Sequence, residues 1–358
     1  MSEYDIRHYR PDDRDGFLSL YRTVMDREKQ EDWFSWKYQG NPYTDNVPMI
    51  VGVADGEIVG ARPFFALPVS IDGDREIGLQ PGDTMVPPEH RRQGLFTRMT
   101  ERAIERYAEN HPFFFNFPND QSRPGYLTRG WEVVSERSSW YRIERPENIA
   151  KSRGSQSIVQ LLSKLGTPIA RGYYALRDRT TATDSGITVR TESELPAEEL
   201  TTLYRTSIPA EIHALRDEEF YQWRFRNPDW EYTTYIAERG TDPVAAIVTG
   251  SSSGPVSTTK LTDVVPLRSA PRPALVSLIS RILTDHSETD LFVAPPQGFP
   301  ESVLRNFGFH TDTTVPLSFL SSQTTHVVRT LTDSWRQNDR DITASENWLL
   351  TFVEEDTS

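Results

Sequence analysis

A basic turn that contains glycine carries the strongest chemical signal in the sequence. It runs from Val86 to Phe96 as VPPEHRRQGLF, between an expected strand and an expected helix. The start of a helix presents unpaired backbone N–H groups and the positive end of the helix dipole, which together favour an anion. Arg91 and Arg92 can add charge-assisted hydrogen bonds to phosphate, and Gly94 lets the backbone approach it closely. We therefore expect a site for a phosphate-bearing cofactor, with an ordinary exposed polar turn as the alternative.

The same turn resembles the acyl-CoA pyrophosphate loop of the GNAT superfamily of N-acetyltransferases. In that family a strand with the pattern Val-x-Pro-x-x-Arg-x-x-Gly leads into a helix, and Val86 to Gly94 matches it. Arg91 and Gly94 also fall on the R/Q-x-x-G-x-G/A signature, in which Phe96 replaces the last small residue. The resemblance implies that CoA contacts Met85, Val86, Arg91, Arg92, Gln93, Gly94, Leu95, Phe96 and Asn119.

A second match follows downstream of this turn. The run N-x-x-S-x-x-x-Y-x-x-x-G-W, from Asn119 to Trp131, is similar to the N-x-x-A-x-x-x-Y-x-x-x-G-F segment of the same superfamily. The family places this tyrosine beside the CoA sulfur, which implies the same position for Tyr126. A phenol with a pKa of about 10 can protonate a departing thiolate. Tyr126 is therefore the candidate general acid, and an aromatic core residue is the alternative.

Acyl transfer to an amine also needs a group that takes the proton of the nucleophile. An alkylamine with a pKa of about 10.4 is almost wholly protonated at neutral pH. Asp83 and Glu89 are the nearest acidic residues, and we favour Asp83 as the base, directly or through water. Either could instead be a solvated or capping carboxylate. Backbone N–H groups at Met85 and Val86 are expected to meet the developing oxyanion.

These residues together predict an acyl-CoA-dependent N-acyltransferase, with acetyl-CoA as the expected donor and a direct attack in a ternary complex. The chain has no cysteine, so no acyl group can be carried on a thiol. A non-catalytic acyl-CoA-binding or interaction module that keeps the fold is the main alternative. A transferase that uses aminoacyl-tRNA is a third, which the acidic charge disfavours. The amine acceptor itself stays open.

Composition narrows the class of protein further. Without cysteine there are no disulfides and no thiolate zinc sites, and the seven histidines lack paired ligand spacing, so no metal is expected. A net charge of −13 and a pI near 5.1 argue against binding to nucleic acid or to anionic lipid. No apolar run is long enough to cross a bilayer and the N-terminus has no apolar leader, so we expect a cytoplasmic protein. Exposed strand edges would permit a homo-oligomer.

Lysine is rare among the basic residues, and arginine supplies most of the positive charge. An acidic chain with little lysine suits a halophilic source. A GC-rich genome would account equally well for the excess of arginine.

The first part of the chain predicts a mixed sheet with helices on its faces. Asp55-Gly56 and Asp72-Gly73 are hairpin signals between runs rich in β-formers. Apolar spacing predicts a helix from Gly94 to Asn110, and Phe113–Phe117 reads as a buried strand. The expected order is β-α-β-β-β-α-β-α-β, with the last strand from Trp131 to Ile143.

The chain is long enough for two hydrophobic cores. We expect a catalytic GNAT domain over 1–145, a helical connector over 146–186, a degenerate GNAT-like domain over 187–320 and a C-terminal tail over 321–358. The fold class is α/β, with two mixed, mainly antiparallel twisted sheets flanked by helices. The tail is expected to be loosely ordered up to an edge strand at Trp348–Phe352.

Short matching segments in the two halves of the chain support an internal repeat. Trp36-Lys-Tyr is followed by Asn41-Pro, and Trp223-Arg-Phe is followed by Asn227-Pro. Asp83-Thr-Met-Val-Pro recurs as Asp263-Val-Val-Pro.

The second copy has prolines at its loop and Leu304 in place of Tyr126, so we expect it to bind no CoA and to pack on the first copy. The aromatic group Trp33, Trp36, Tyr38 and Tyr43 is expected in the core or between the domains, with an acceptor pocket as the alternative.

Overall fold

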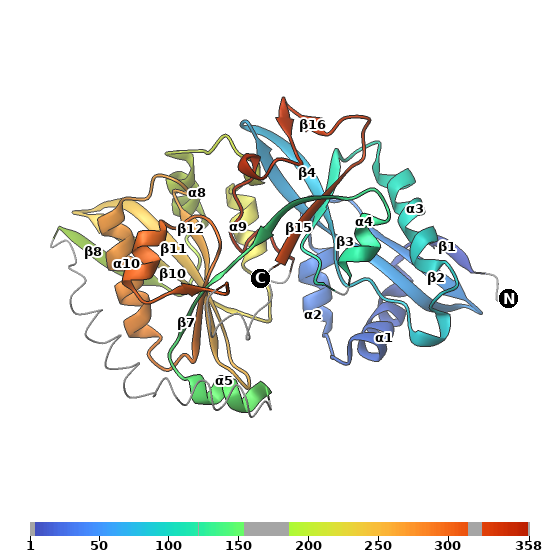
Figure 1. The fold of residues 1–358 in the computed structure, drawn as a ribbon, viewed down its shortest axis with the longest axis horizontal. Helices are drawn as coiled ribbons and strands as arrows, with labels where there is room; N and C mark the ends of the chain where they lie inside the picture. Colours follow the sequence, from blue (N-terminus) through green and yellow to red (C-terminus); the bar gives the residue numbers. More distant parts are fainter. Residues whose placement is uncertain (1–3, 121, 154–185, 314–323, 357–358) are drawn as a thin grey trace.

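Two lobes, each built on one twisted sheet, make up the protein (Figure 1). The computed structural model describes residues 4–120, 122–153, 186–313 and 324–356. In these ranges no helix has both the length and the apolar character needed to span a bilayer. The mixed α/β class expected from the sequence is confirmed.

The first sheet has the strand order β1-β2-β3-β4-β5-β15-β6. All neighbours are antiparallel except β4 and β5, which are parallel. Its strands are β1 (Asp5–His8), β2 (Met49–Ala54), β3 (Glu57–Ile71), β4 (Asp74–Pro81), β5 (Phe113–Asn116), β6 (Glu132–Arg137) and β15 (Thr324–Thr330). The helical elements of this lobe are η1 (Pro11–Asp13), α1 (Arg14–Met25), α2 (Glu31–Phe34), the π-helical turn η2 (Ser35–Gln39), η3 (Pro88–His90), α3 (Leu95–Tyr107) and α4 (Arg123–Leu127).

Both predicted hairpin turns are confirmed. Asp55 and Gly56 have φ angles of 52° and 84°, and Asp72 and Gly73 have 52° and 92°. Two successive residues with positive φ are typical of the type I′ turn, whose twist matches that of the flanking strands. These turns fix β2, β3 and β4 as a meander.

The second sheet has the strand order β14-β7-β13-β12-β11-β10-β8. Its strands are β7 (Trp140–Ile143), β8 (Ile187–Glu192), β10 (Glu231–Arg239), β11 (Asp242–Ser252), β12 (Thr258–Val265), β13 (Leu291–Ala294) and β14 (His310–Thr311). The helices are α5 (Pro146–Arg153), α8 (Ala197–Arg205), α9 (Glu218–Arg224), α10 (Arg272–Asp285) and α11 (Glu301–Asn306). Three short strands, β9 (His213–Ala214), β16 (Arg336–Gln337) and β17 (Arg340–Asp341), and the turn η5 (Ser345–Asn347) complete the description. The remainder of the expected connector, 154–185, lies outside the described residues.

The two lobes exchange one strand each. β7 pairs with β13 and β14 in the second sheet, while β15, drawn in red in Figure 1, lies between β5 and β6 of the first. The expectation of one strand from Trp131 to Ile143 that completes the first domain is therefore wrong. The segment after Arg137 leaves for the other sheet, and a strand from the C-terminal region takes the inner position.

The C-terminal region also differs from the expected loose tail. Trp348 and Leu349 are buried, and Trp348 packs on His326 of β15 with ring centroids 4.6 Å apart. The predicted edge strand at Trp348–Phe352 is wrong, because its ladder pairing with the described residues is a single bridge from Trp348 to Ile212. Its alternating apolar residues are buried by packing between the lobes instead.

Strand order is the same in both sheets. Read from β8, the second sheet runs β8-β10-β11-β12-β13-β7-β14, and its one parallel pair, β12 and β13, matches the parallel pair β4 and β5. The imported strand also occupies the same position in each sheet. This agreement supports the predicted duplication and the boundary near Ile187, which remain predictions.

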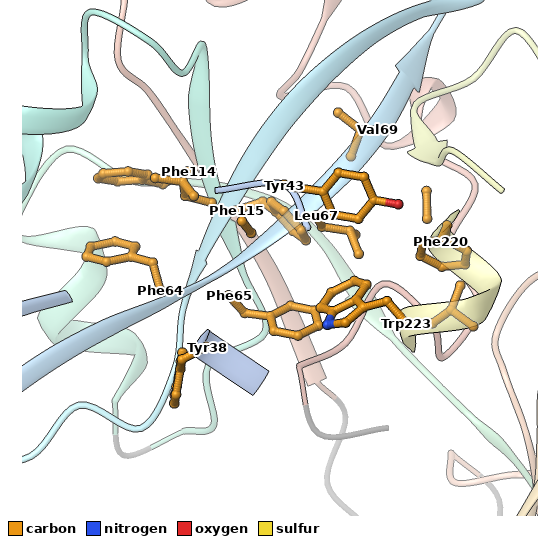
Figure 2. Packing of buried hydrophobic residues seen from close by; sticks show 14 of the residues in the cluster. Tyr38, Tyr43, Phe64, Phe65, Leu67, Val69, Phe114, Phe115, Phe220 and Trp223 are labelled. Carbon is orange, nitrogen blue, oxygen red and sulfur yellow. The ribbon is translucent and has the colours of Figure 1, made fainter. Parts of the chain in front are cut away.

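Trp36 and Trp223, which occupy equivalent positions in the two matching segments, meet between the lobes. Trp36 Nε1 donates to the Trp223 carbonyl at 3.1 Å, and Trp223 Nε1 donates to the Trp36 carbonyl at 2.9 Å. Trp223 also stacks on Phe65 at 5.1 Å and meets the edge of Tyr43 at 5.5 Å. Figure 2 shows Trp223 and Phe220 of α9 beside the side chains of β3. One continuous core therefore joins the lobes, and the core role expected for Trp36 and Tyr43 is confirmed.

A buried ionic network fastens the C-terminal segment to the second lobe. Arg216, which is fully buried, donates to Asp263 at 2.9 Å and to Glu354 at 3.2 Å. Thr351 accepts from the same guanidinium at 3.0 Å. Because both carboxylates serve one buried cation, the network links the strand β12, the approach to α9 and the end of the chain.

His213 makes the protein sensitive to acid. Burial lowers the pKa of His213 from 6.5 to about 4, so the ring is neutral near pH 7. Its Nδ1 donates to the Glu211 carbonyl at 2.6 Å, and in the neutral ring Nε2 therefore accepts from Tyr204 OH at 2.8 Å.

We expect this histidine to cost stability as the pH falls. Because the unfolded chain binds the proton first, the contribution of His213 is complete above the unfolded pKa and is lost as the pH falls from about 6.5 towards 4. Between about pH 7.5 and pH 5 the loss is about 2 kcal/mol, measurable by urea unfolding. His213→Gln keeps a donor and an acceptor without titrating, so it should flatten this slope. An unchanged slope would contradict the assignment.

Candidate functional site

The first sheet opens between β4 and β5. The two strands share a single parallel ladder pair, Leu79 with Phe114, whereas the chain after Pro81 continues along β3. There Met85 forms an isolated antiparallel bridge with Ala61. Because this segment stays paired with β3 while its pairing with β5 has ended, the backbone that follows Met85 faces an opening in the sheet.

The bridge decides which backbone groups face that opening. Met85 N–H donates to the Ala61 carbonyl at 2.9 Å and the Met85 carbonyl accepts from Ala61 N–H at 3.0 Å. The expected oxyanion role of the Met85 N–H is therefore wrong, because that donor is already used within the sheet. Successive residues of an extended chain point their N–H groups to opposite sides, so Val86 presents its N–H away from β3.

The glycine turn forms the start of α3. Gly94 precedes the helix with a φ of 80°, a conformation that glycine adopts without strain, and a Cβ at this position would meet no atom within 4 Å. The first-turn N–H groups of α3 have no acceptor within the helix. Arg91 Nε donates to the Val86 carbonyl at 2.8 Å and thereby closes the loop onto the strand. The turn thus has the open, donor-rich form that an anion requires.

A cavity of about 220 Å³ lies at this helix start. It is smaller than the range of roughly 300–1,000 Å³ that is usual for whole drug-sized ligands, so it can enclose only part of a cofactor. Its lining is Val86, His90, Arg91, Arg92, Gly94, Leu95, Phe96, Thr97 and Arg129. Most residues expected to contact CoA are therefore brought together.

Three of the expected contacts do not line the cavity. Met85 is fully buried in the core. Gln93 accepts from Tyr4 OH at 2.8 Å and donates to the Glu89 carbonyl at 2.9 Å, so it supports the loop from outside. The Asn119 carboxamide accepts from the Ser122 N–H at 3.0 Å and so braces the approach to α4.

Arg129 is a cavity residue that the sequence did not indicate. It follows α4, donates to Thr97 Oγ1 at 2.8 Å, and places its guanidinium 4.6 Å from the centre of the Phe96 ring. Arg62 of β3 lies 4.7 Å from the same ring. Phe96 stands where the family pattern has a small residue, and these contacts explain why an aromatic side chain fits there. A basic residue three positions after Tyr126 was the signal available in the sequence.

Tyr126 is held at the inner end of this arrangement, on α4. Its side chain is only 7% exposed, and its hydroxyl accepts from Asn116 Nδ2 at 2.7 Å. The Asn116 amide has a fixed orientation because its Oδ1 accepts from the Phe117 N–H at 2.8 Å. The phenol proton is therefore not used by Asn116 and remains free to be donated. Burial raises the pKa of Tyr126, while the charge of Arg62 and the Asn116 hydrogen bond act to lower it.

Asp83 lies in a second cluster of charges. Its Oδ2 accepts from Lys37 Nζ at 2.6 Å and from Tyr38 OH at 2.6 Å. Lys37, only 2% exposed, also donates to Asp356 at 2.9 Å. Although burial alone would lower it, the two carboxylates raise the pKa of Lys37. Asp356 is close enough to raise the pKa of Tyr126, so the two clusters share one electrostatic environment.

Asp83 and its counterpart Asp263 have similar surroundings. Each binds a buried cation and a tyrosine hydroxyl. For Asp83 these are Lys37 and Tyr38, and for Asp263 they are Arg216 and Tyr221.

The second half of the chain differs from the first at two positions of the candidate site. Pro271 precedes α10 at the place of the cofactor turn, and a buried Leu304 stands at the position of Tyr126. These differences agree with the expected lack of CoA binding in that half, which stays a prediction.

No group of three His, Asp or Glu side chains suited to a metal occurs in the part of the chain that the structure describes.

Residues 5–134 match the sequence model of a family described as an acetyltransferase (GNAT) domain. This segment is a GNAT domain. It contains the glycine turn, Tyr126 and Asp83, and it leaves out the imported strand β15, which completes its sheet from the far end of the chain. No curated protein sequence matches the chain.

Solved structures extend the likeness beyond the GNAT segment. A probable N-acyltransferase from Enterococcus faecalis matches with a TM-score of 0.64 and 10% identity over 92% of this chain and 73% of its own. GCN5-related N-acetyltransferases from Kribbella flavida and Anabaena variabilis give TM-scores of 0.61 and 0.59. Their identities are 14% and 11%, with 92% of this chain covered in each and 71% and 73% of theirs. At such identities the agreement concerns the fold, and it includes both lobes.

The residues present fit a CoA diphosphate on structural grounds. The cavity combines Arg91, Arg92 and Arg129 with the start of α3, and Gly94 has open space where a Cβ would lie. Phe96 and Arg62 then continue from the cavity to Tyr126. A phosphate-bearing end and a thioester end would therefore each find suitable groups.

Proposed function

We propose that the protein is an acyl-CoA-dependent N-acyltransferase, with acetyl-CoA as donor. The observation that carries this proposal is the cavity at the start of α3, with three arginines around it and a buried tyrosine beyond Phe96. The helix start and the guanidinium groups suit the diphosphate of CoA. The GNAT segment supports the same class of reaction.

When bound, acyl-CoA supplies an activated acyl thioester. Tyr126 donates its free phenol proton at the position of the leaving sulfur. Val86 N–H, directed into the sheet opening, can donate to the oxygen on which negative charge develops. The net reaction converts an amine and a thioester to an amide and a free thiol.

Asp83 is our candidate for the group that takes the amine proton. Its Oδ2 is occupied by Lys37 and Tyr38, whereas Oδ1 accepts no hydrogen bond from the described residues. We therefore assign proton uptake to Oδ1, directly or through one water molecule. The acceptor is an amine that approaches from the side of Lys37 and Asp356, the latter in the C-terminal segment.

A thiol-release screen tests this function. Purified protein is mixed with acetyl-CoA and a panel of amines that spans small amines, amino sugars and peptides, and free thiol is detected with Ellman's reagent. The chain contributes no background because it has no cysteine. We expect amine-dependent release that saturates in both substrates. Binding of CoA without release for any amine would favour the non-catalytic acyl-CoA-binding module instead.

A further inference from the structure

Arg62 is a buried cation without an anionic partner in the described part of the chain. It lies on β3 opposite Ile50, and only 1% of its surface is exposed. Its Nη1 donates to Thr84 Oγ1 at 3.3 Å, and its buried Nε has no partner among the described residues. No ion pair to Arg62 occurs in the described ranges. A charge removed from water is costly unless something compensates for it.

Two other buried arginines show what is missing. Arg216 has the carboxylates of Asp263 and Glu354, and Arg137 has Glu355 at 3.1 Å. Arg62 instead faces aromatic rings, with its guanidinium carbon 4.7 Å from the centre of Phe96 and 5.8 Å from that of Tyr126. Rings compensate only a part of the lost hydration. The structure therefore leaves one positive charge directed at the junction between the cavity and Tyr126.

The position of this charge matches the place where negative charge would appear. During acyl transfer the bond between the acyl carbon and sulfur breaks, the sulfur takes the electron pair, and Tyr126 supplies the proton. Negative charge then moves from the sulfur to the phenol oxygen, until solvent returns a proton to Tyr126. A fixed cation in a dry site stabilises such a charge more strongly than water does.

We propose that Arg62 is a catalytic residue that stabilises the negative charge shared by the CoA sulfur and the Tyr126 oxygen. This proposal rests on the function proposed above. It assigns to a β3 side chain, outside both sequence motifs, the task of making the sulfur a better leaving group and the phenol a better acid.

The charged groups around the pair set the direction of its effect on protonation. The Arg62 charge lowers the pKa of Tyr126 against the upward effect of burial, and Asp356 acts in the opposite direction. Burial and Arg129 lower the pKa of Arg62 itself, whereas Tyr126 raises it. Removal of the Arg62 charge should therefore leave both the phenol and a nearby thiol harder to ionise.

The test is a pH titration of the CoA thiol in the complex of the protein with CoA that carries no acyl group. The ultraviolet absorbance of the thiolate reports its ionisation. The protein has no cysteine, so no protein thiolate contributes, and a titration of the protein without CoA subtracts the ionisation of its tyrosines. In the unaltered protein we expect the bound thiol to have a lower pKa than free CoA. Arg62→Met should raise it so that the ratio of thiolate to thiol falls about tenfold at a given pH, which corresponds to about one pKa unit. Arg62→Lys should restore a part of the shift.

Arg98→Met is the matched control. Arg98 lies on α3 and donates to the Tyr4 carbonyl at 2.8 Å, away from Tyr126, so its loss should leave the bound thiol pKa unchanged. A bound thiol in the unaltered protein that titrates at or above the value of free CoA would overturn the proposal without any variant. An Arg62→Met complex with an unchanged thiol pKa would do the same. Failure of CoA to bind at all would instead refute the proposed function.

Discussion

Replacement of Tyr126 by phenylalanine should lower kcat by about 100-fold to 10,000-fold, the usual contribution of a positioned general acid. The affinity for CoA should change by less than about threefold, because the phenol hydroxyl bonds to Asn116 and lies outside the cavity lining. Steady-state thiol release gives kcat, and calorimetry gives the affinity. The variant also leaves Asn116 Nδ2 without its acceptor, so stability is measured in parallel.

Tyr107→Phe is the control for this substitution. Tyr107 lies on α3, is also 7% exposed, and has a buried hydroxyl without a hydrogen-bond partner in the described residues. Burial raises its pKa as it does that of Tyr126. Loss of its hydroxyl should leave kcat unchanged. Equal rates for Tyr126→Phe and the unaltered protein would remove Tyr126 from the reaction.

The second large effect concerns stability. Asp263→Ala should lower the free energy of unfolding by about 3–5 kcal/mol, because it leaves the fully buried Arg216 with Glu354 as its single carboxylate partner. The C-terminal segment should become more accessible to protease, since Glu354 and Thr351 belong to the same network. Urea unfolding and limited proteolysis measure the two consequences.

An exposed pair provides the comparison. Glu301 and Arg305 lie one helical turn apart on α11 at 3.4 Å, where solvent screens their attraction. Glu301→Ala should therefore change stability by less than about 0.5 kcal/mol. A loss below about 1 kcal/mol for Asp263→Ala would show that the buried network contributes little beyond the hydrophobic groups around it.

Local chemistry made much of the first lobe predictable. The turns at Asp55-Gly56 and Asp72-Gly73 need positive φ, which the sequence supplies, and the Val86–Phe96 turn joins a strand to a helix as its residues indicate. Six of the residues expected at the cofactor turn do line one cavity: Val86, Arg91, Arg92, Gly94, Leu95 and Phe96. In each case the deciding residues are neighbours in the sequence.

Long-range pairing could not be predicted in the same way. The β15 strand joins Thr324–Thr330 to Phe113–Asn116, and nothing in either segment specifies the other across so long an intervening chain. The alternation at Trp348–Phe352 resembled a strand because its apolar residues are buried, yet they are buried between lobes. Period-2 alternation reports burial on one side and does not distinguish a ladder from an extended packed segment.

The residues of the candidate site also divide into those that a local motif indicated and those that only the tertiary structure brings together. Tyr126 was found through a local motif, whereas Arg62, Asn116 and Arg129 meet it or the cavity only because β3, β5 and the end of α4 converge there. Asp83 was recognised as an acid near the loop, but its pairing with Lys37 depends on packing of the η2 turn against β3. Charge clusters of this kind follow from tertiary structure.

Calorimetric titration with acetyl-CoA tests the central claim most directly, beside Gly94→Glu and the control Gly56→Glu. Both glycines have positive φ, 80° and 84°, and open space around a Cβ, so the two substitutions impose similar backbone strain. Only Gly94 lies at the cavity, where a carboxylate would repel the diphosphate. We expect binding with a dissociation constant of about 1 μM, weakened at least about tenfold by Gly94→Glu and unchanged by Gly56→Glu. No binding to the unaltered protein, or equal loss in both variants, would contradict an acyl-CoA site at the start of α3.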